Sequence, residues 1–308
     1  MSAELPAPVI VYDAARVQAF EALYAQALAA AGGPLAYTLP YPKYEFLGYV
    51  AERKPVVLHG SNDPDIAEFV PRREGVDANP QGNVLGIYAA ADGIWPLFFA
   101  VLNKRTYRGS MRNGVAWNVA GQEVDFSPTA PQPDAYKVYE FSLNAEQLDK
   151  PIWGPGTLYL LPRATFEQER YANGLLSPEW TSRVPVRPLA RLAVTPEDFP
   201  FLRQVSGHDD AYVFRMHDLL TGFWREQRRT EELADGYALE FEWSQDWAGR
   251  VVEYVHLSRT HFPVCAVELT AEAQRGPVWL RLRGPETYKR FIVKTRDRVE
   301  RAAAEAAA

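Results

Sequence analysis

The sequence predicts an α+β protein, and two kinds of stretch lead to this fold class. Residues 13–31 are rich in alanine and leucine, with apolar residues near helical spacing, and two glycines follow them. Residues 136–143 and 156–166 are instead rich in β-branched and aromatic residues, which favours a twisted antiparallel sheet. At 308 residues, the chain is long enough for about two domains.

The composition is that of a globular protein with an acidic balance. Hydrophobic residues make up 47% of the chain and charged residues 23%, and the net charge is −6. This charge argues against a protein that coats nucleic acid through its overall field, although a local basic groove stays possible.

The number of cysteines and the hydropathy of the chain indicate in which cellular compartment the protein is expected. The single cysteine, Cys265, excludes an internal disulfide and a cysteine-based zinc site and fits a reducing interior. The first residues do not follow the secretory-signal pattern, and no stretch approaches the roughly 20 apolar residues of a membrane helix. We therefore expect a soluble, cytoplasmic protein without a membrane partner.

The first elements form a helix and then a helix–strand pair. The amphipathic helix of residues 13–31 is expected to pack on the outside of a catalytic domain, and a shorter helix over residues 44–53 leads into a strand that begins at Val56. The residues that follow, up to 83, crowd Asn, Asp, Pro and Gly and therefore predict a loop.

Further along, residues 90–101 have apolar side chains near helical spacing, and Asp92 is placed to cap that helix. Residues 107–134 predict a hairpin and loop. A short helix over 144–149 separates the two strand-like runs. Residues 184–194 are expected to form the last strand of this domain, with a boundary at 195–200.

The last third of the chain has a different pattern. A long mixed segment, residues 209–234, precedes expected strands at 236–244, 250–258, 264–269 and 277–284, and a helix over 285–308 closes the chain. We interpret it as a second α+β domain or a lid, and we detect no internal repeat. The predicted organisation is an N-terminal helical extension (1–43), a central domain (44–199) and a C-terminal α+β domain of unknown role (200–308).

Two strand-like runs each deliver one chemically distinctive side chain. The run VVLHGS carries His59, and GIYAAADGIWPLFFAVL, which begins at Gly86, carries Tyr88. A polar or aromatic residue in a strand that otherwise holds core side chains is typical of a small-molecule site.

These two runs resemble the NAD-contacting strands of ADP-ribosyltransferases of the poly(ADP-ribose) polymerase and diphtheria-toxin type. The resemblance covers roughly residues 44–199 and implies a split antiparallel β-sheet core with flanking helices. It implies that NAD is the substrate, that His59 and Gly60 hold its ribose and carboxamide, and that Tyr88 stacks on nicotinamide. The family's third motif is a glutamate on a later strand, which we match to Glu179.

The glutamate assignment has rivals in Glu140, Glu167 and Glu169. We prefer Glu179 because it enters a late strand-like run in the way that the family's third motif does. Each residue of the triad also has an ordinary structural explanation: His59 as a satisfied strand histidine, Tyr88 as a core aromatic, and Glu179 as a surface carboxylate or helix cap.

Ser61 and Arg72 are further candidates for binding NAD. Ser61 can add a hydrogen bond next to His59, and the guanidinium of Arg72 or of Arg73 suits the pyrophosphate. Two solvated surface arginines are the alternative.

No metal site is predicted. His208 and His217 each precede an aspartate, but two such pairs without further ligands are accidental matches. His256, His261 and Cys265 follow no zinc-binding spacing.

Two basic clusters interrupt the acidic chain, and we interpret them as solvated helix faces. They are also the first surface to test for a nucleic-acid acceptor. Their members are Arg225, Arg228 and Arg229, and then Lys289, Arg290, Lys294, Arg296 and Arg298.

The leading hypothesis is an enzyme that transfers ADP-ribose from NAD to a protein, nucleic acid or small molecule and releases nicotinamide. Bond cleavage passes through an oxocarbenium-like state, which Glu179 is suited to stabilise. The alternative is a catalytically inactive module of the same fold that binds a ligand or a protein. A related RNA phosphotransferase is a third possibility, but it needs more basic residues in the cleft than the sequence offers.

Overall fold

The computed structural model describes residues 4–72, 84–107, 109–119, 135–170, 176–209, 211–261, 264–274 and 276–307. The described residues form two compact units, with 4–72 and 86–209 in the first and 84–85 and those of 211–307 in the second. Each unit is described by itself below.

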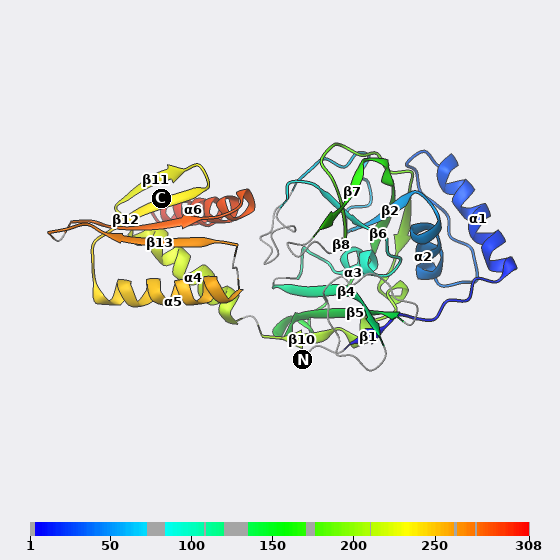
Figure 1. Cartoon of the computed structure of the whole chain (residues 1–308), viewed down its shortest axis with the longest axis horizontal. Helices are drawn as coiled ribbons and strands as arrows, with labels where there is room; N and C mark the ends of the chain where they lie inside the picture. The colour runs from blue at the N-terminus through cyan, green and yellow to red at the C-terminus, as the bar shows by residue number, and fades with distance from the viewer. Residues whose placement is uncertain are drawn as a thin grey trace. The chain divides into compact units, whose positions relative to one another are not determined.

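A six-stranded antiparallel sheet forms the centre of the first unit (Figure 1). Its strand order is β7-β8-β3-β2-β6-β9, so strands far apart in the sequence become neighbours. The strands are β2 (Val56–Ser61), β3 (Ile87–Ala90), β6 (Gly156–Pro162), β7 (Phe166–Arg170), β8 (Leu176–Ser182) and β9 (Ala190–Val194).

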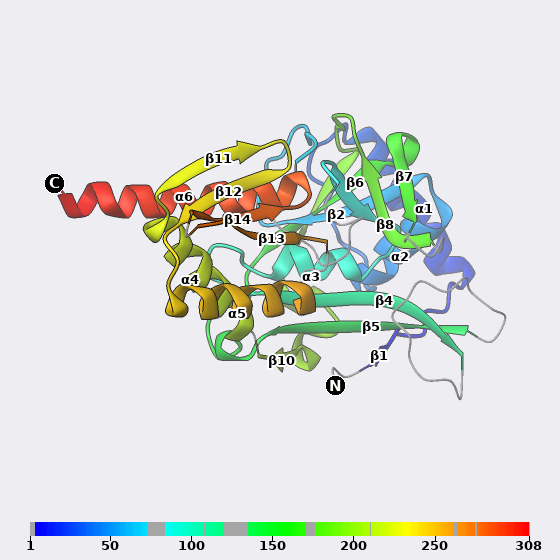
Figure 2. The ribbon, with the colours of Figure 1, turned by 60° about the vertical axis from the view of Figure 1, so that its left-hand side comes forward.

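A second sheet of the same unit is built on the long antiparallel pair β4 (Met111–Val119) and β5 (Ala135–Asn144), which run side by side in Figure 2. The other edge of β5 pairs with β1 (Leu5–Pro6) in antiparallel and with β10 (Ser206–His208) in parallel. The short turns η2 (Ala145–Gln147), η3 (Arg163–Thr165), η4 (Pro196–Asp198) and η5 (Leu202–Gln204) connect strands of this unit.

Three helices complete the main core of the first unit: α1 (Ala14–Ala29), α2 (Lys43–Arg53) and α3 (Trp95–Val101). Asp13 begins α1 by accepting a hydrogen bond from the Arg16 backbone at 2.8 Å. Phe20 of α1 and Phe46 of α2 are fully buried in the core that also contains the six-stranded sheet. Residues 4–43 are thus part of this unit and not a separate extension.

The six-stranded sheet is apolar on both faces, because residues of a strand point alternately to either side. Leu58, Ala90 and Leu158 belong to the main core, whereas Val57, Ala89 and Tyr159 belong to a smaller core on the opposite face.

Helix α3 lies very close to the main face of this sheet. A Cβ atom on Gly60 would be 2.0 Å from the carbonyl oxygen of Pro96, and one on Gly156 would be 1.9 Å from that of Ala100. Two strand glycines therefore let the helix backbone rest directly on β2 and β6.

The end of the first unit differs from the prediction in two ways. Residues 184–189 lie outside the strand, which begins only at Ala190, and Val186 forms an isolated bridge with Phe69. The boundary expected at 195–200 is also wrong as a structural division, because Phe199 and Phe201 are buried in the main core and β10 still pairs with β5.

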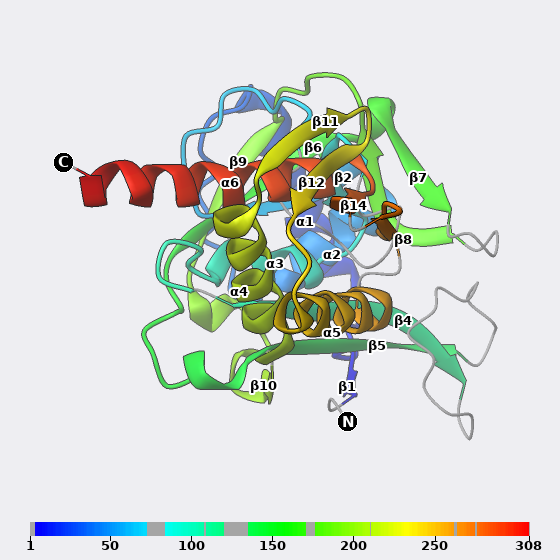
Figure 3. The ribbon, with the colours of Figure 1, turned by 90° about the vertical axis from the view of Figure 1, so that its left-hand side faces the viewer.

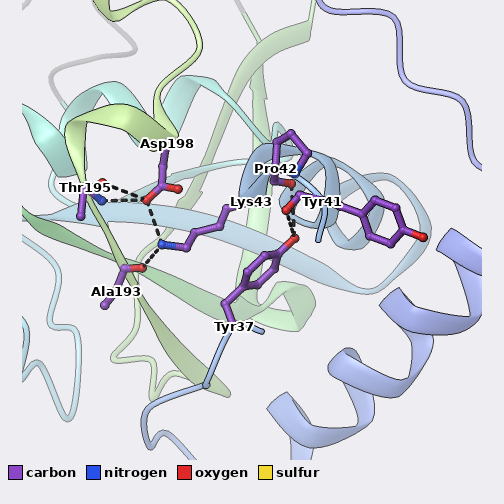
Figure 4. Close-up of polar contacts among 7 residues, drawn as sticks. All are labelled: Tyr37, Tyr41, Pro42, Lys43, Ala193, Thr195 and Asp198. Atoms are coloured by element: carbon purple, nitrogen blue, oxygen red, sulfur yellow. Dashed lines mark hydrogen bonds and ion pairs between the residues drawn. The ribbon is translucent and has the colours of Figure 1, made fainter. Parts of the chain in front are cut away.

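Polar contacts fix the start of α2 against the end of β9 (Figure 4). Lys43 donates hydrogen bonds to the Ala193 carbonyl at 3.0 Å and to Asp198 Oδ2 at 2.9 Å, and Asp198 also accepts from the Thr195 backbone. Tyr37 donates to the Tyr41 carbonyl just before the helix. These contacts hold the helix that leads directly into β2.

The described part of the second unit has one four-stranded antiparallel sheet, in the order β11-β12-β14-β13, and three helices. Figure 3 shows α4 crossing between α5 and α6. The elements are α4 (Ala211–Glu226), β11 (Arg229–Leu233), β12 (Gly236–Phe241), α5 (Gln245–His261), β13 (Ala266–Ala271), β14 (Val278–Arg283) and α6 (Glu286–Ala307).

This unit contains an internal repeat that the sequence does not reveal. A helix followed by a hairpin occurs twice, as α4-β11-β12 and then α5-β13-β14. The second strands of the two hairpins pair in antiparallel, with Gly236 opposite Arg283 and Phe241 opposite Val278. The two hairpins are thus related by an approximate two-fold axis through the sheet.

The strand predicted at 250–258 is wrong, because these residues belong to α5. The β-branched residues of this stretch favour a strand locally. However, the buried residues Trp247, Val251, Tyr254 and Ser258 recur at helical spacing, and their burial against the other helices determines the structure.

The α+β class and the antiparallel sheets are confirmed. Among the described residues, no helix combines the length and the apolar character that crossing a bilayer requires.

Candidate functional site

The two motif strands are neighbours. β2 and β3 pair in antiparallel with Leu58 opposite Ala90, and His59 Nδ1 lies 2.6 Å from the backbone oxygen of Tyr88. Since a carbonyl oxygen only accepts hydrogen bonds, Nδ1 carries the proton and donates it. The structure therefore brings His59 and the Tyr88 backbone into direct contact.

The surroundings of His59 keep its imidazole neutral. Its ring contacts that of Phe69 edge-on at 4.9 Å, and the side chain is half-buried. Burial lowers the pKa of His59 from 6.5 to about 4, against the effect of the Tyr88 carbonyl. With the proton held on Nδ1, Nε2 is an acceptor for a ligand hydroxyl.

Two cationic side chains act on this imidazole. The charges of Lys104 and Arg72 both contribute to the lowered pKa of His59. The Arg72 backbone donates a hydrogen bond to the Gly86 carbonyl at 3.1 Å, which fixes it at the start of β3. The field next to His59 is therefore positive and suits an anionic group. Arg73 lies outside the described residues.

Glu179 lies on β8, the strand next to β3, directly opposite Ala90. Leu58, Ala90 and Glu179 thus form one row across three strands. Directly opposite residues of antiparallel strands share a face of the sheet. Tyr88, two residues from Ala90, lies on that same face, whereas His59 belongs to the other face, with Phe69. The structure brings Tyr88 and Glu179 to one face of the sheet. His59 lies on the opposite face, and its contact with this group is the hydrogen bond to the Tyr88 backbone.

Thr181 is a residue of this face that the sequence analysis missed. It lies opposite Tyr88, only 1% of its surface is exposed, and its hydroxyl oxygen has no hydrogen-bond partner among the residues that the structure describes. A buried unpaired hydroxyl is unfavourable by about 1–3 kcal/mol. No signal in the sequence marks it, because its significance depends on strand pairing.

Gly60 and Ser61 have structural roles that involve no ligand. Gly60 makes room for the backbone of α3, as described above. The Ser61 hydroxyl accepts a hydrogen bond from the Asp63 backbone at 3.1 Å and so turns the chain after β2. Binding of NAD by these two residues remains a prediction.

The rival glutamates lie in different places. Glu140 is on β5, in the other sheet. Glu167 lies on β7 opposite Thr181, so it shares the face of Tyr88, but its side chain is exposed. Glu179 is half-buried and one strand closer to β3. The side chain of Glu169 lies outside the described residues.

Asp92 accepts hydrogen bonds from the backbone at the start of α3, although the N-cap position is Ile94 and not Asp92 as predicted, and it also joins this helix to the second sheet. Its Oδ1 accepts from the Ile94 and Trp95 backbones, and its Oδ2 accepts from Lys137 at 2.9 Å and from Tyr139 at 2.8 Å. Burial opposes ionisation, yet Lys137 and the helix amides hold the pKa of Asp92 below its ordinary value. The sequence analysis missed Lys137 and Tyr139, which lie about 45 residues further along the chain.

Most of the basic residues of the two predicted clusters are paired with carboxylates. The pairs are Arg228 with Glu242, Arg229 with Glu231, Lys289 with Glu232, Arg290 with Glu286 and Arg296 with Asp297. The side chains of Lys294 and Arg298 lie outside the described residues. Paired surface charges fit solvated faces better than a phosphate-binding surface.

Within the part of the chain that the structure describes, no group of three or more His, Cys, Asp or Glu side chains is arranged to hold a metal ion. Comparison of the chain with protein-family models, with curated proteins and with solved structures yields no match.

Proposed function

We propose that the protein transfers ADP-ribose from NAD to an acceptor and releases nicotinamide. The observation that carries this proposal is the junction of the two motif strands, where His59 of the His-Gly-Ser run bonds to the backbone of Tyr88 in the Gly-Ile-Tyr run. Glu179 on the next strand adds a carboxylate to the face of Tyr88.

His59 would bind a ribose hydroxyl. Its neutral ring donates through Nδ1 to the protein and leaves Nε2 to accept a hydrogen bond from the sugar hydroxyl. Because burial keeps the pKa near 4, this acceptor persists throughout the neutral range. Arg72 and Lys104, whose charges reach His59, would favour the pyrophosphate nearby.

Tyr88 and Glu179 would act on the nicotinamide end. An aromatic face attracts a flat cationic ring by ~0.5–2 kcal/mol. As the bond to nicotinamide breaks, positive charge moves to the ribose, where the carboxylate of Glu179 would stabilise it. The hydroxyl of Thr181, opposite Tyr88 and without a partner among the described residues, offers a further polar group on this face.

The test is nicotinamide release from NAD by the wild type and Glu179→Gln, which keeps the shape of the side chain and removes its charge. We expect a loss of ~10²–10³ in rate, the usual effect of removing a preorganised electrostatic group. Glu146→Gln, at an exposed carboxylate of η2, is the matched control and is expected to keep the wild-type rate.

Glu167→Gln decides between the two glutamates that share a face with Tyr88. We expect a change of less than about threefold, since Glu167 is exposed and one strand further away. If Glu167→Gln instead abolishes nicotinamide release while Glu179→Gln does not, Glu167 of β7 and not Glu179 is the catalytic carboxylate.

One observation favours the catalytically inactive alternative. The alternation along β2 and β3 directs His59 to the opposite face of the sheet from Tyr88 and Glu179. Saturable NAD binding by the wild type without nicotinamide release, with binding lost in His59→Ala, would support a ligand-sensing module.

A further inference from the structure

A histidine that is held between two serine hydroxyls lies in the second sheet of the first unit. This sheet is distinct from the six-stranded sheet that carries His59, Tyr88 and Glu179. His208 of β10 lies opposite Asn144 of β5, and Ser110 immediately precedes β4 beside the same row. The sequence analysis treated His208 as accidental. The pairing of β10 with β5 gives it two defined partners.

Both ring nitrogens of His208 are engaged. Nε2 lies 2.9 Å from the Ser110 hydroxyl, and Nδ1 lies 2.9 Å from the Ser142 hydroxyl. Ser142 is fully buried, whereas Ser110 and His208 are half-buried. The imidazole is therefore anchored from the inner side, and Ser110 is the more accessible of the two hydroxyls.

The backbone of Ser110 is fixed by its neighbours. The Tyr107 hydroxyl donates to the Ser110 carbonyl and accepts a hydrogen bond from the Asn144 backbone at 3.0 Å. A Cβ on the intervening Gly109 would lie 2.8 Å from Asn144 Cβ, so the approach of Ser110 to the strand depends on glycine. A hydroxyl placed this closely on an imidazole has the geometry of a nucleophile and its general base.

We propose that Ser110 is a nucleophile toward carboxylic esters, with His208 as its base and Ser142 as the positioning residue. In the tautomer that this reaction requires, Nδ1 keeps its proton and donates to Ser142, and Nε2 accepts the proton of Ser110 as its oxygen attacks the ester carbonyl carbon. The bond to the alcohol then breaks, and the alcohol takes the proton from Nε2. Water hydrolyses the acyl-serine by the same proton path, which releases the acid and restores Ser110.

The experiment is labelling of the full-length protein with an alkyl fluorophosphonate, which phosphonylates an activated serine with loss of fluoride. The labelled peptide and the rate are read by mass spectrometry. We expect the label on Ser110, no label at that peptide in Ser110→Ala, and a rate at least about a hundredfold lower in His208→Gln. Ser142→Ala is expected to slow labelling by a smaller factor.

Ser206→Ala is the matched control, because Ser206 lies opposite Ser142 on β10 but its hydroxyl bonds to the Phe141 carbonyl. It is expected to keep the wild-type rate. The labelling rate of the wild type should also fall when the pH is lowered, because a protonated imidazole cannot accept the proton of Ser110. A merely structural histidine would not cause this dependence, and its measurement does not rely on the folding of a variant.

Labelling of Ser110 no faster than of Ser206, or a wild-type rate without this pH dependence, would overturn the proposal. Ser110→Ala should retain nicotinamide release, so failure of this proposal is distinguishable from failure of the proposed ADP-ribose transfer.

Discussion

At the scale of single residues, His59 shows how burial determines the role of a side chain. The imidazole of an exposed histidine changes charge near neutral pH. His59 packs on Phe69 and donates a hydrogen bond to the Tyr88 carbonyl. Its pKa is lowered to about 4, so its imidazole is uncharged at neutral pH. A neutral imidazole with a fixed proton accepts hydrogen bonds at one atom only, which gives the residue a defined direction toward a ligand.

This lowered pKa also links His59 to stability. Between pH 6.5 and 4 the unfolded chain binds a proton that the folded chain excludes, so the free energy of unfolding falls as the pH drops. The loss amounts to on the order of 3 kcal/mol and is absent above pH 6.5. Urea denaturation at pH 7 and pH 4.5 should show a smaller difference for His59→Gln than for the wild type.

His256→Gln, at an exposed position of α5, is the control for that experiment and should keep the wild-type difference. An equal pH dependence in His59→Gln and the wild type would mean that His59 is not kept neutral by the fold.

At the scale of elements, α3 is held at both of its sides. Gly60 and Gly156 admit its backbone to the six-stranded sheet, and Asp92 ties its first turn to Lys137 and Tyr139 of β5. The helix thereby joins the strand that carries Tyr88 to the second sheet.

We expect Asp92→Asn to lower the free energy of unfolding by about 3 kcal/mol, because it removes a buried carboxylate and leaves the half-buried Lys137 ammonium without its counter-charge. Urea denaturation at pH 7 measures the change. The exposed pair of Glu68 with Arg187 is the control, and Glu68→Gln should change stability by less than about 1 kcal/mol. A loss below about 1 kcal/mol in Asp92→Asn would show that the Asp92–Lys137 pair does not hold α3.

The elements that could be predicted from the sequence are those with a local signal. The helical spacing that gives α1 and the apolar runs of β2 and β6 all lie within a few residues. The helix over Gln245–His261 could not be predicted from β-propensity, because packing against other helices determines it.

The same division applies to the candidate sites. His59 and Tyr88 stand out in the sequence because they interrupt apolar strands. Thr181, Lys137 and the two serines around His208 do not, since only the pairing of distant strands brings them to their partners.

At the scale of the whole molecule, the chain has two compact units with separate hydrophobic cores. The core of the second unit is formed by α4, α5, α6 and the two central strands of its sheet, and none of its described residues belongs to a core of the first unit. We therefore expect the units to differ in their response to a core substitution.

Leu280 of β14 is fully buried in the core of the second unit. Leu280→Ala should destabilise that unit by about 2–5 kcal/mol and leave nicotinamide release within about twofold of the wild type at a temperature where the variant is folded. The loss of nicotinamide release by the folded variant would show that the second unit takes part in the reaction.

The measurement that tests the central claim most directly is nicotinamide release from NAD by the full-length wild type, with and without cell extract as a source of acceptors. The account predicts release that increases when extract is added and that depends on the carboxylate of Glu179. No release by the wild type under either condition would contradict it.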